Sequence, residues 1–160
     1  MNRKPEAAPA AGKLLLPHPV QAALAAAAAA AWPQEACGLL LGRRQPGQVQ
    51  VDAFAATRNA AADPRSGYLV PPLELLAADH EARRYGREIV AIWHSHPDAP
   101  ARPSQRDVAE AWRGYPYGIQ AATRAGAGEL RFFELAPAAG PAAGIREWQI
   151  ELVAETEAWQ

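Results

Sequence analysis

The sequence predicts an α+β fold, in which helices flank a curved, mixed β-sheet. Two observations point to it. The expected helices and strands follow one another without the regular strand–helix–strand alternation of a parallel α/β protein. The chain has 160 residues, which suits one domain with a full hydrophobic core. We expect that domain to span residues 13–153, after a Pro- and Ala-rich, disordered N-terminus over 1–12. Residues 154–160 form a tail without a structural assignment.

The first half of the chain predicts a helix followed by a β-hairpin. Residues Val20–Trp32 are dense in alanine and contain neither Gly nor Pro, which favours a helix that ends at Pro33. The short apolar run Cys37–Leu41 is typical of a buried strand. A turn at 45–47 then leads to the strand Val49–Phe54, which we expect to pair back on the first strand.

The second half predicts a loop, two helices and four further strands. The loop spans 56–70 and contains an Asp-Pro and a Ser-Gly step. Helices are expected over Pro71–Tyr85 and Ser104–Arg113, and three prolines stiffen the loop over 97–103. Glu88–Ser95 is rich in good strand formers and is the expected central strand. The remaining expected strands are Tyr117–Thr123, Glu129–Leu135 and Ile145–Val153.

Charge and cysteine content disfavour two classes of protein. The 16 Lys and Arg residues nearly balance the 17 Asp and Glu residues, so a basic groove for nucleic acid is not expected. A single cysteine rules out an intrachain disulfide. It fits a reducing compartment, and we expect the protein to be cytoplasmic.

Residues 14–31 have a second interpretation, as a secretory signal peptide, because Arg3 and Lys4 precede an apolar run. Pro17 and His18 interrupt this run, and alanine contributes little hydrophobicity, so we favour the helix. No other segment approaches the ~20 apolar residues of a membrane span, and no membrane partner is expected.

The stretch His94-Ser95-His96-Pro97 carries the strongest chemical signal. Alternate residues of a strand point to the same face, so the two imidazoles lie roughly 7 Å apart along the chain. Asp107 follows after a short loop, and two His with one carboxylate are common ligands of a catalytic zinc. The alternative is an exposed edge strand with two polar side chains. The apolar residues before His94 favour a central strand instead, where unpaired imidazoles would need partners.

Four residues have both a chemical and a structural interpretation. Glu35 precedes the first strand and could accept a proton from a zinc-bound water, or lie on the surface as most glutamates do. Ser104 and Asp107 have the spacing of an N-terminal capping pair, which the local sequence alone favours. A helix start could also hold Asp107 against a metal while Ser104 faces the substrate. Cys37 fits a small buried residue better than a nucleophile or a fourth ligand, because a thiolate in place of water would close the site.

The chain contains a His-x-His pair, then a Ser after seven further residues, and then an Asp after two more. In this spacing it resembles the JAMM zinc metallopeptidases, also called MPN+ or JAB. The segment Glu-Ala-Cys-Gly-Leu-Leu-Leu-Gly, which begins at Glu35, resembles the upstream glutamate segment of that family. The similarity runs from about Gln34 to Glu151 and is closest to small, single-domain bacterial members.

The resemblance implies a JAB/MPN architecture, which is cytidine-deaminase-like, and one Zn²⁺ per chain. It implies His94, His96 and Asp107 as metal ligands. It also implies Glu35 as the general base and Ser104 as a hydrogen-bond donor to the oxyanion.

The family resemblance also implies a substrate class. JAMM peptidases typically cleave peptide or isopeptide bonds after the C-terminal glycines of ubiquitin or ubiquitin-like proteins, which in bacteria include sulfur carriers and conjugates. The backbone groups of loop 56–70 have no evident partners in the sequence, so an extended Gly-Gly tail could add there as a strand.

Two other classes remain as alternatives. One is a catalytically silent, MPN-type scaffold for protein interactions, although such relatives usually lose motif residues that this chain retains. The other is the related domain of bacterial DNA-repair-associated proteins, which the balanced charge disfavours. The sequence does not predict an oligomeric state.

Overall fold

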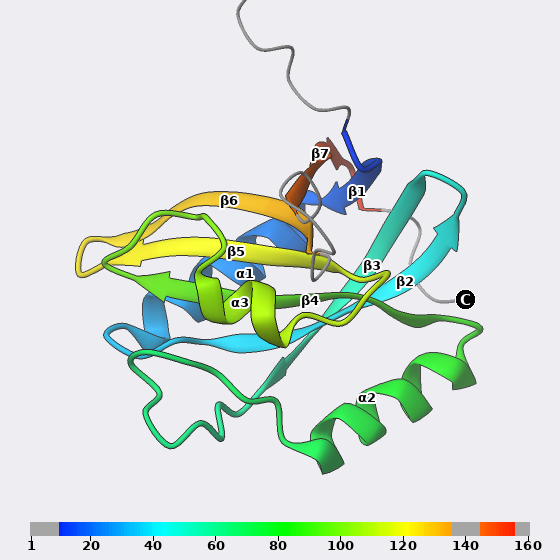
Figure 1. The fold of residues 1–160 in the computed structure, drawn as a ribbon. Coiled ribbons are helices and arrows are strands. Elements are labelled where there is room, and N and C mark those ends of the chain that lie inside the picture. The colour runs from blue at the N-terminus through cyan, green and yellow to red at the C-terminus, as the bar shows by residue number, and fades with distance from the viewer. Residues whose placement is uncertain (1–9, 136–144, 156–160) are drawn as a thin grey trace, which may run out of the picture.

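The computed structural model describes residues 10–135 and 145–155, in which seven strands form one barrel-like sheet and three helices pack against it (Figure 1). The strand order is β1-β3-β2-β4-β5-β6-β7, and the sheet closes because β1 pairs with both β3 and β7. The strands are β1 (Lys13–Pro17), β2 (Cys37–Gln45), β3 (Gln48–Thr57), β4 (Glu88–Pro97), β5 (Pro116–Thr123), β6 (Gly126–Leu135) and β7 (Ile145–Val153). The helices are α1 (His18–Ala31), α2 (Pro72–Arg84) and α3 (Gln105–Glu110).

Strand β4 lies at the centre of the sheet. It pairs antiparallel with β2 and parallel with β5, and its residues from Ile89 to His96 are all buried. Its apolar first half favours such a position, because β-branched and aromatic side chains pack well in a sheet covered on both faces. In the register of β2 and β4, Cys37 lies opposite His94. The chain just before β2 therefore meets the carboxyl end of β4.

Helix α1 covers one side of the core. Val20, Leu24 and Ala28 are spaced four residues apart, share one face of the helix and are buried. They belong to a hydrophobic cluster that also contains Trp93 of β4 and Phe132 of β6. This packing fixes β4 from the side opposite to helix α2.

Helix α2 is less deeply packed. Among its residues only Ala82 is buried, whereas Leu73 and Leu76 are 80% and 63% exposed. The helix lies against β2 and β4. No helix in the described part of the chain is both long and apolar enough to cross a membrane.

The α+β class agrees with the sequence prediction, but the sheet is closed and not merely curved. Closure depends on β1, a strand that the sequence analysis did not predict. Leu14 and Leu16 of β1 are buried, and the strand pairs in parallel with β3 and β7. Parallel partners lie far away in sequence, so no local pattern reveals them.

The predicted helix over Ser104–Arg113 is too long, since α3 ends at Glu110. The N–H of Trp112, which a longer helix would use internally, donates to the hydroxyl of Tyr117 at 2.6 Å. This contact with β5 replaces the helical hydrogen bond and ends α3 early.

The ends of the chain lie mostly outside the described residues, including 1–9 of the predicted disordered segment and 156–160 of the tail. Just before β1, the N–H of Ala11 donates to the carbonyl of Glu147 at 3.0 Å. The carbonyl of Gly12 accepts from the N–H of Gln149 at 2.9 Å. Both bonds attach the chain before β1 to β7.

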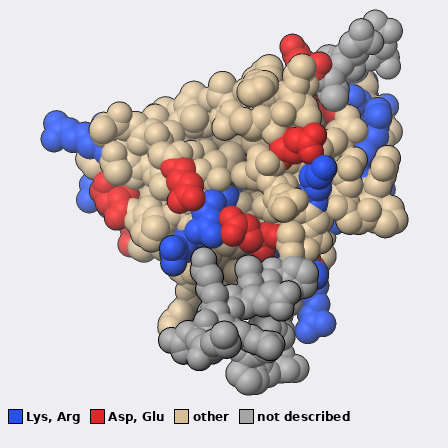
Figure 2. Space-filling view, turned by 90° about the horizontal axis from the view of Figure 1, so that it is seen from above, with Lys and Arg blue, Asp and Glu red and all other residues tan. Residues whose placement is uncertain are grey.

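Acidic and basic side chains are interspersed on the face of the molecule seen in Figure 2. Ion pairs of this kind join β1, β6 and β7 and comprise Lys13–Glu151, Arg131–Glu147 and Arg146–Glu134. Charges that alternate in sign over such short distances largely cancel one another.

Candidate metal centre and active site

Two histidines at the carboxyl end of β4 form the base of the candidate site. The alternation of the strand places His94 and His96 on one face, and both are buried. Their Nε2 atoms face each other at 3.0 Å. The Nδ1 atom of His96 lies 2.9 Å from the carbonyl of Pro100 and donates to it. This bond leaves the lone pair of a neutral His96 on Nε2, pointing into the site.

Asp107, in the first turn of α3, completes the set of three. One carboxylate oxygen lies 3.1 Å from His96 Nε2 and the other lies 3.3 Å from His94 Nε2. Although burial alone would raise the pKa of Asp107, the two neighbouring imidazoles and the N–H of Ser104 outweigh it and hold that pKa well below its usual range.

The capping interpretation of Ser104 and Asp107 also holds. Ser104 Oγ accepts from the N–H of Asp107 at 3.0 Å, and the Asp107 carboxylate accepts from the N–H of Ser104 at 2.8 Å. The cap therefore fixes the aspartate that points at the histidines, and the two interpretations describe one arrangement.

The separations between the three side chains fit a zinc ion. Tetrahedral ligands with bonds of 2.0–2.1 Å to zinc place neighbouring donor atoms about 3.3 Å apart. Here the two Nε2 atoms are 3.0 Å apart, and the two carboxylate oxygens of Asp107 lie 3.1 Å from His96 and 3.3 Å from His94, one oxygen facing each ring. Two imidazole nitrogens that face each other need a shared proton to attract, whereas a cation accepts both lone pairs. The buried Nδ1 atom of His94 has no hydrogen-bond partner in the part of the chain that the structure describes, and the ring stacks on Tyr68 with ring centroids 4.3 Å apart.

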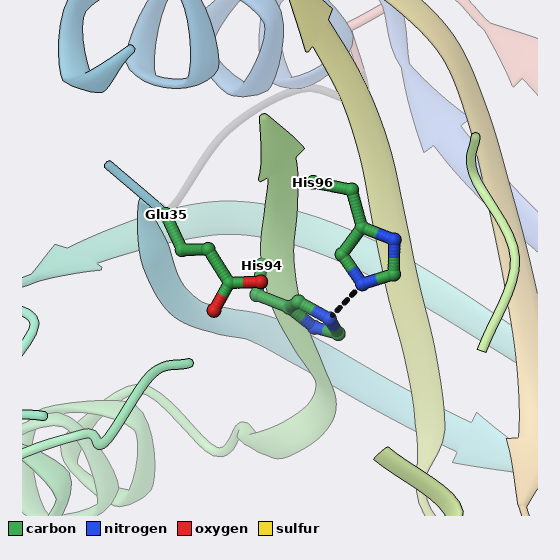
Figure 3. A group of neighbouring side chains, drawn as sticks. All are labelled: Glu35, His94 and His96. Atoms are coloured by element: carbon green, nitrogen blue, oxygen red, sulfur yellow. Dashed lines mark hydrogen bonds between the residues drawn. The ribbon is translucent and has the colours of Figure 1, made fainter. Parts of the chain in front are cut away.

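Glu35 lies beside this group and is 8% exposed. One donor atom each of Glu35, His94 and His96 lie within 4.8 Å of one another (Figure 3). The Oε2 atom of Glu35 is buried and has no hydrogen-bond partner among the described residues. Burial, with a smaller contribution from Asp107, raises the pKa of Glu35 to about 7 against the opposing effect of His96. Asp107 lies closer to both imidazoles than Glu35 does. Glu35 is therefore the carboxylate whose oxygen is available to accept a proton.

Two hydrogen bonds join the segment of Glu35 to β4. Ser95, the residue between the histidines, accepts from the N–H of Ala36 through its Oγ at 2.8 Å. The N–H of Ser95 donates to the carbonyl of Ala36 at 2.9 Å. The fully buried Ser95 thus links the ligand strand to the position that follows Glu35.

The loop between β3 and α2 has partners for its backbone, contrary to the expectation from the sequence. Asn59 donates to the carbonyls of Glu35 and Gly67 and accepts from the N–H groups of Ala61 and Leu69. One partly buried amide side chain therefore satisfies these backbone groups, and strand addition is not needed to satisfy them.

A cavity of about 380 Å³ opens beside the cluster between this loop and the residues that precede α3. Glu35, His96, Ser104 and Asp107 all line it, and His94 lies buried behind them. The exposed Ser104 Oγ accepts its capping bond, which leaves its own proton free to be donated into the cavity. The structure thus brings together the five residues singled out in the sequence.

Cys37 lies outside this group, as its burial within a strand predicts. Its thiol donates to the carbonyl of Arg58 at 3.3 Å and lies 3.4 Å from the hydroxyl of Thr57. Burial raises the pKa of the Cys37 thiol. A protonated thiol with these partners is a poor nucleophile and a poor metal ligand.

Three residues that shape the site, Ser95, Asn59 and Tyr68, were not predicted from the sequence. The position of Ser95 between two candidate ligands was a usable signal, because a side chain on the opposite face of the strand must have another partner. Asn59 and Tyr68 act across the fold, and no sequence pattern points to them.

Comparisons with known proteins identify the family of this chain. A family model described as prokaryotic homologs of the JAB domain matches residues 17–136. A probable TtuB-protein conjugate cleaving protease from Thermus thermophilus is 43% identical over 88 residues, which are 54% of this chain and 55% of the relative. A desampylase from Haloferax volcanii is 35% identical over 88 residues, which are 54% of this chain and 62% of the relative. The matches thus span less than two thirds of these curated relatives.

Two solved structures share the fold. The solution structure of a protein from Desulfitobacterium hafniense has a TM-score of 0.78 and 30% identity, covering 90% of this chain and 95% of the other. That of a protein from Salinibacter ruber has a TM-score of 0.64 and 30% identity, covering 90% and 93%. Because the family model also spans most of the sequence, this chain belongs to the family of prokaryotic homologs of the JAB domain.

Proposed function

We propose that this chain is a zinc-dependent metallopeptidase that hydrolyses the peptide or isopeptide bond after the C-terminal Gly-Gly of a ubiquitin-like protein. One observation carries the proposal. The donor atoms of His94, His96 and Asp107 face one another at separations of 3.0–3.3 Å, and beside them lies a carboxylate oxygen of Glu35 that has no partner among the described residues. A site with three protein ligands and an adjacent base is the arrangement of hydrolytic zinc enzymes.

His94, His96 and Asp107 would hold the ion. Bound there, zinc would act as a Lewis acid on the scissile carbonyl and would lower the pKa of a water molecule toward ~7. Asp107 supplies the negative charge of the set, and its depressed pKa keeps it ionised. The bond from His96 Nδ1 to Pro100 keeps the other nitrogen of that ring free to bind.

Glu35 and Ser104 would act on the substrate from the cavity wall. The open oxygen of Glu35 accepts a proton from the attacking water and then returns it to the leaving amine. The hydroxyl proton of Ser104 is donated to the oxyanion as the carbonyl becomes tetrahedral. Hydrolysis by this route needs no covalent intermediate.

Two observations support the ubiquitin-like substrate. The Thermus relative is named for cleaving a protein conjugate, and the motif spacing is that of peptidases that cleave after glycine. In addition, His96 and Asp107 line the cavity, where a residue without a side chain can approach them most closely. The single buried thiol fits a reducing compartment, which supports a cytoplasmic location.

The test is cleavage of a ubiquitin-like protein extended past its Gly-Gly end, followed by intact mass. The zinc-loaded protein should release the extension, and a chelator should stop the reaction. Glu35→Gln should reduce turnover by roughly 10²-fold or more while zinc stays bound, because it removes a base and no ligand. Glu81→Gln, an exposed change of the same chemistry on α2, should leave turnover unchanged.

The silent-scaffold alternative makes the opposite prediction of no stoichiometric zinc and no turnover.

Replacing the last glycine of the ubiquitin-like protein by leucine should block cleavage. If the leucine variant, or an unstructured peptide, is cut equally well, the chain is a general peptidase and the substrate proposal is wrong.

A further inference from the structure

Three arginines line the same cavity as the candidate catalytic residues. Arg65 lies on the loop before α2, Arg102 on the loop between β4 and α3, and Arg106 on α3. They therefore come from both walls of the cavity. Guanidinium groups in such a position can bind an anionic part of a substrate in a planar, two-pronged contact.

Arg106 already has partners. Its Nε donates to Glu110 at 3.0 Å, and its guanidinium group lies across Gly67, where an added Cβ would be 2.6 Å from Nη1. Arg106 thus connects α3 to the opposite loop and forms part of the cavity wall.

Arg65 and Arg102 have no ion pair within 4.0 Å in the described part of the chain. Asp63, next to Arg65 in space, accepts instead from the hydroxyl of Ser66 and from a backbone N–H. Glu147 feels the charge of Arg102, but it is bound by two hydrogen bonds from Arg131 at 2.8 Å. The side chains of Arg65 and Arg102 are both exposed.

The carboxylates that line the cavity already have a partner or a proposed role, so they do not pair with Arg65 or Arg102. Asp107 faces the histidines, Glu110 pairs with Arg106, and Glu35 is buried beside the histidines. Two guanidinium groups consequently remain for a ligand that brings its own negative charge.

We infer that Arg65 and Arg102 bind the α-carboxylate of the leaving group, so that the preferred substrate carries a single amino acid after the Gly-Gly end. This inference rests on the proposed function. Hydrolysis adds water across the scissile amide, so that the glycine leaves as a carboxylate and the amino acid leaves as an amine. An amino acid places a carboxylate two bonds from the scissile nitrogen, whereas the α-carboxyl of a lysine within a protein is consumed in a peptide bond.

The size of the cavity agrees with a small leaving group. Its volume of about 380 Å³ lies at the lower end of the range for small-molecule pockets. The wall formed by Pro97, Pro100 and Pro103 is stiff, because proline fixes the backbone. A folded protein attached through a lysine would have to lie outside this wall.

The experiment compares three extensions of the ubiquitin-like protein used to test the proposed function. The first is one alanine with a free carboxylate, the second is alanine amide, and the third is a peptide joined through a lysine side chain. The zinc-loaded protein should cleave the first about tenfold more efficiently than the second, in kcat/KM, because charge-assisted hydrogen bonds at an exposed site contribute modestly. The third should be cleaved no faster than the second.

We then test Arg65→Gln, Arg102→Gln and the double variant. In each, the ratio of kcat/KM for the first substrate to kcat/KM for the second should move toward one, mainly because KM for the carboxylate substrate rises. Arg43→Gln is the matched control, because Arg43 is exposed and lies six residues along β2 from Cys37, about 20 Å from the site. It should keep the ratio. Higher ionic strength should also reduce the preference.

The outcomes separate the two proposals. If none of the three substrates is cut, the proposed function is wrong and this inference falls with it. If they are cut without a preference for the free carboxylate, or if the double variant keeps the preference, only the inference is wrong. Preferential cleavage of the lysine-linked peptide would show that the arginines recognise something other than an α-carboxylate.

Discussion

At the residue scale, the candidate site depends on side chains that each make two kinds of contact. Asp107 accepts a capping hydrogen bond and faces both imidazoles, and Ser104 caps α3 and lines the cavity. The spacing of these residues in the sequence predicted which side chains belong to the site. It could not decide between cap and ligand, because that decision depends on where β4 places His94 and His96 relative to α3.

The double role of Ser104 leads to a prediction with two variants. Ser104→Gly and Ser104→Ala both remove the hydroxyl, but glycine is a far better N-cap than alanine. Turnover should fall in both variants by an amount equivalent to about 2–4 kcal/mol in activation free energy. The free energy of unfolding should fall by about 1 kcal/mol in the alanine variant and by only a few tenths in the glycine variant.

Steady-state kinetics and thermal unfolding of both variants measure these effects. If turnover follows stability, so that Ser104→Gly is almost fully active, Ser104 acts only as a cap and has no role toward the oxyanion.

At the scale of elements, the site lies where three segments from different parts of the chain meet. The strand Glu88–Ser95 and the loop after it were predicted well, because strand formers and prolines are local signals. The hydrogen bonds between Ser95 and Ala36 span 59 positions and could not be predicted. The missed strand β1 has the same cause, since its partner β7 lies far away in sequence. The early end of α3 depends on a nearer contact, the hydrogen bond between Trp112 and Tyr117, which no helix or strand pattern reveals.

Ser95→Ala tests whether this junction positions Glu35. The variant leaves the N–H of Ala36 without its acceptor, which should cost about 1–3 kcal/mol in the free energy of unfolding. Zinc content should stay the same because no ligand changes. Turnover should fall by roughly tenfold or more, because small displacements of a reacting group are expensive.

Metal analysis, chemical unfolding and kinetics of Ser95→Ala separate these effects. Unchanged turnover in a destabilised variant would show that Ser95 supports the fold without positioning Glu35.

At the scale of the whole molecule, the sequence predicted the α+β class but not the closure of the sheet. Hydrophobic patterns indicate which segments are strands, whereas closure depends on β1 meeting both β3 and β7. The fold brings together the candidate ligands at positions 94, 96 and 107 with the candidate base at position 35. A metal that binds this arrangement only in the folded state should stabilise the entire domain.

Metal removal should therefore lower the melting temperature. Zinc at 1,000 times its Kd contributes about 4 kcal/mol, which for a chain of this size corresponds to about 10 °C. The double variant His94→Ala, His96→Ala should lose this response to chelator and to added zinc. Differential scanning calorimetry measures it, and equal melting temperatures with and without zinc would contradict folded-state binding.

The most direct test of the central claim is an anomalous diffraction map at the zinc absorption edge, from crystals of the zinc-loaded protein. We predict one peak per chain at about 2.0–2.2 Å from His94 Nε2, His96 Nε2 and a carboxylate oxygen of Asp107, with Glu35 close by but not bound. A peak at another place, a metal bound by Glu35 in place of Asp107, or no peak between the two histidines would contradict the account.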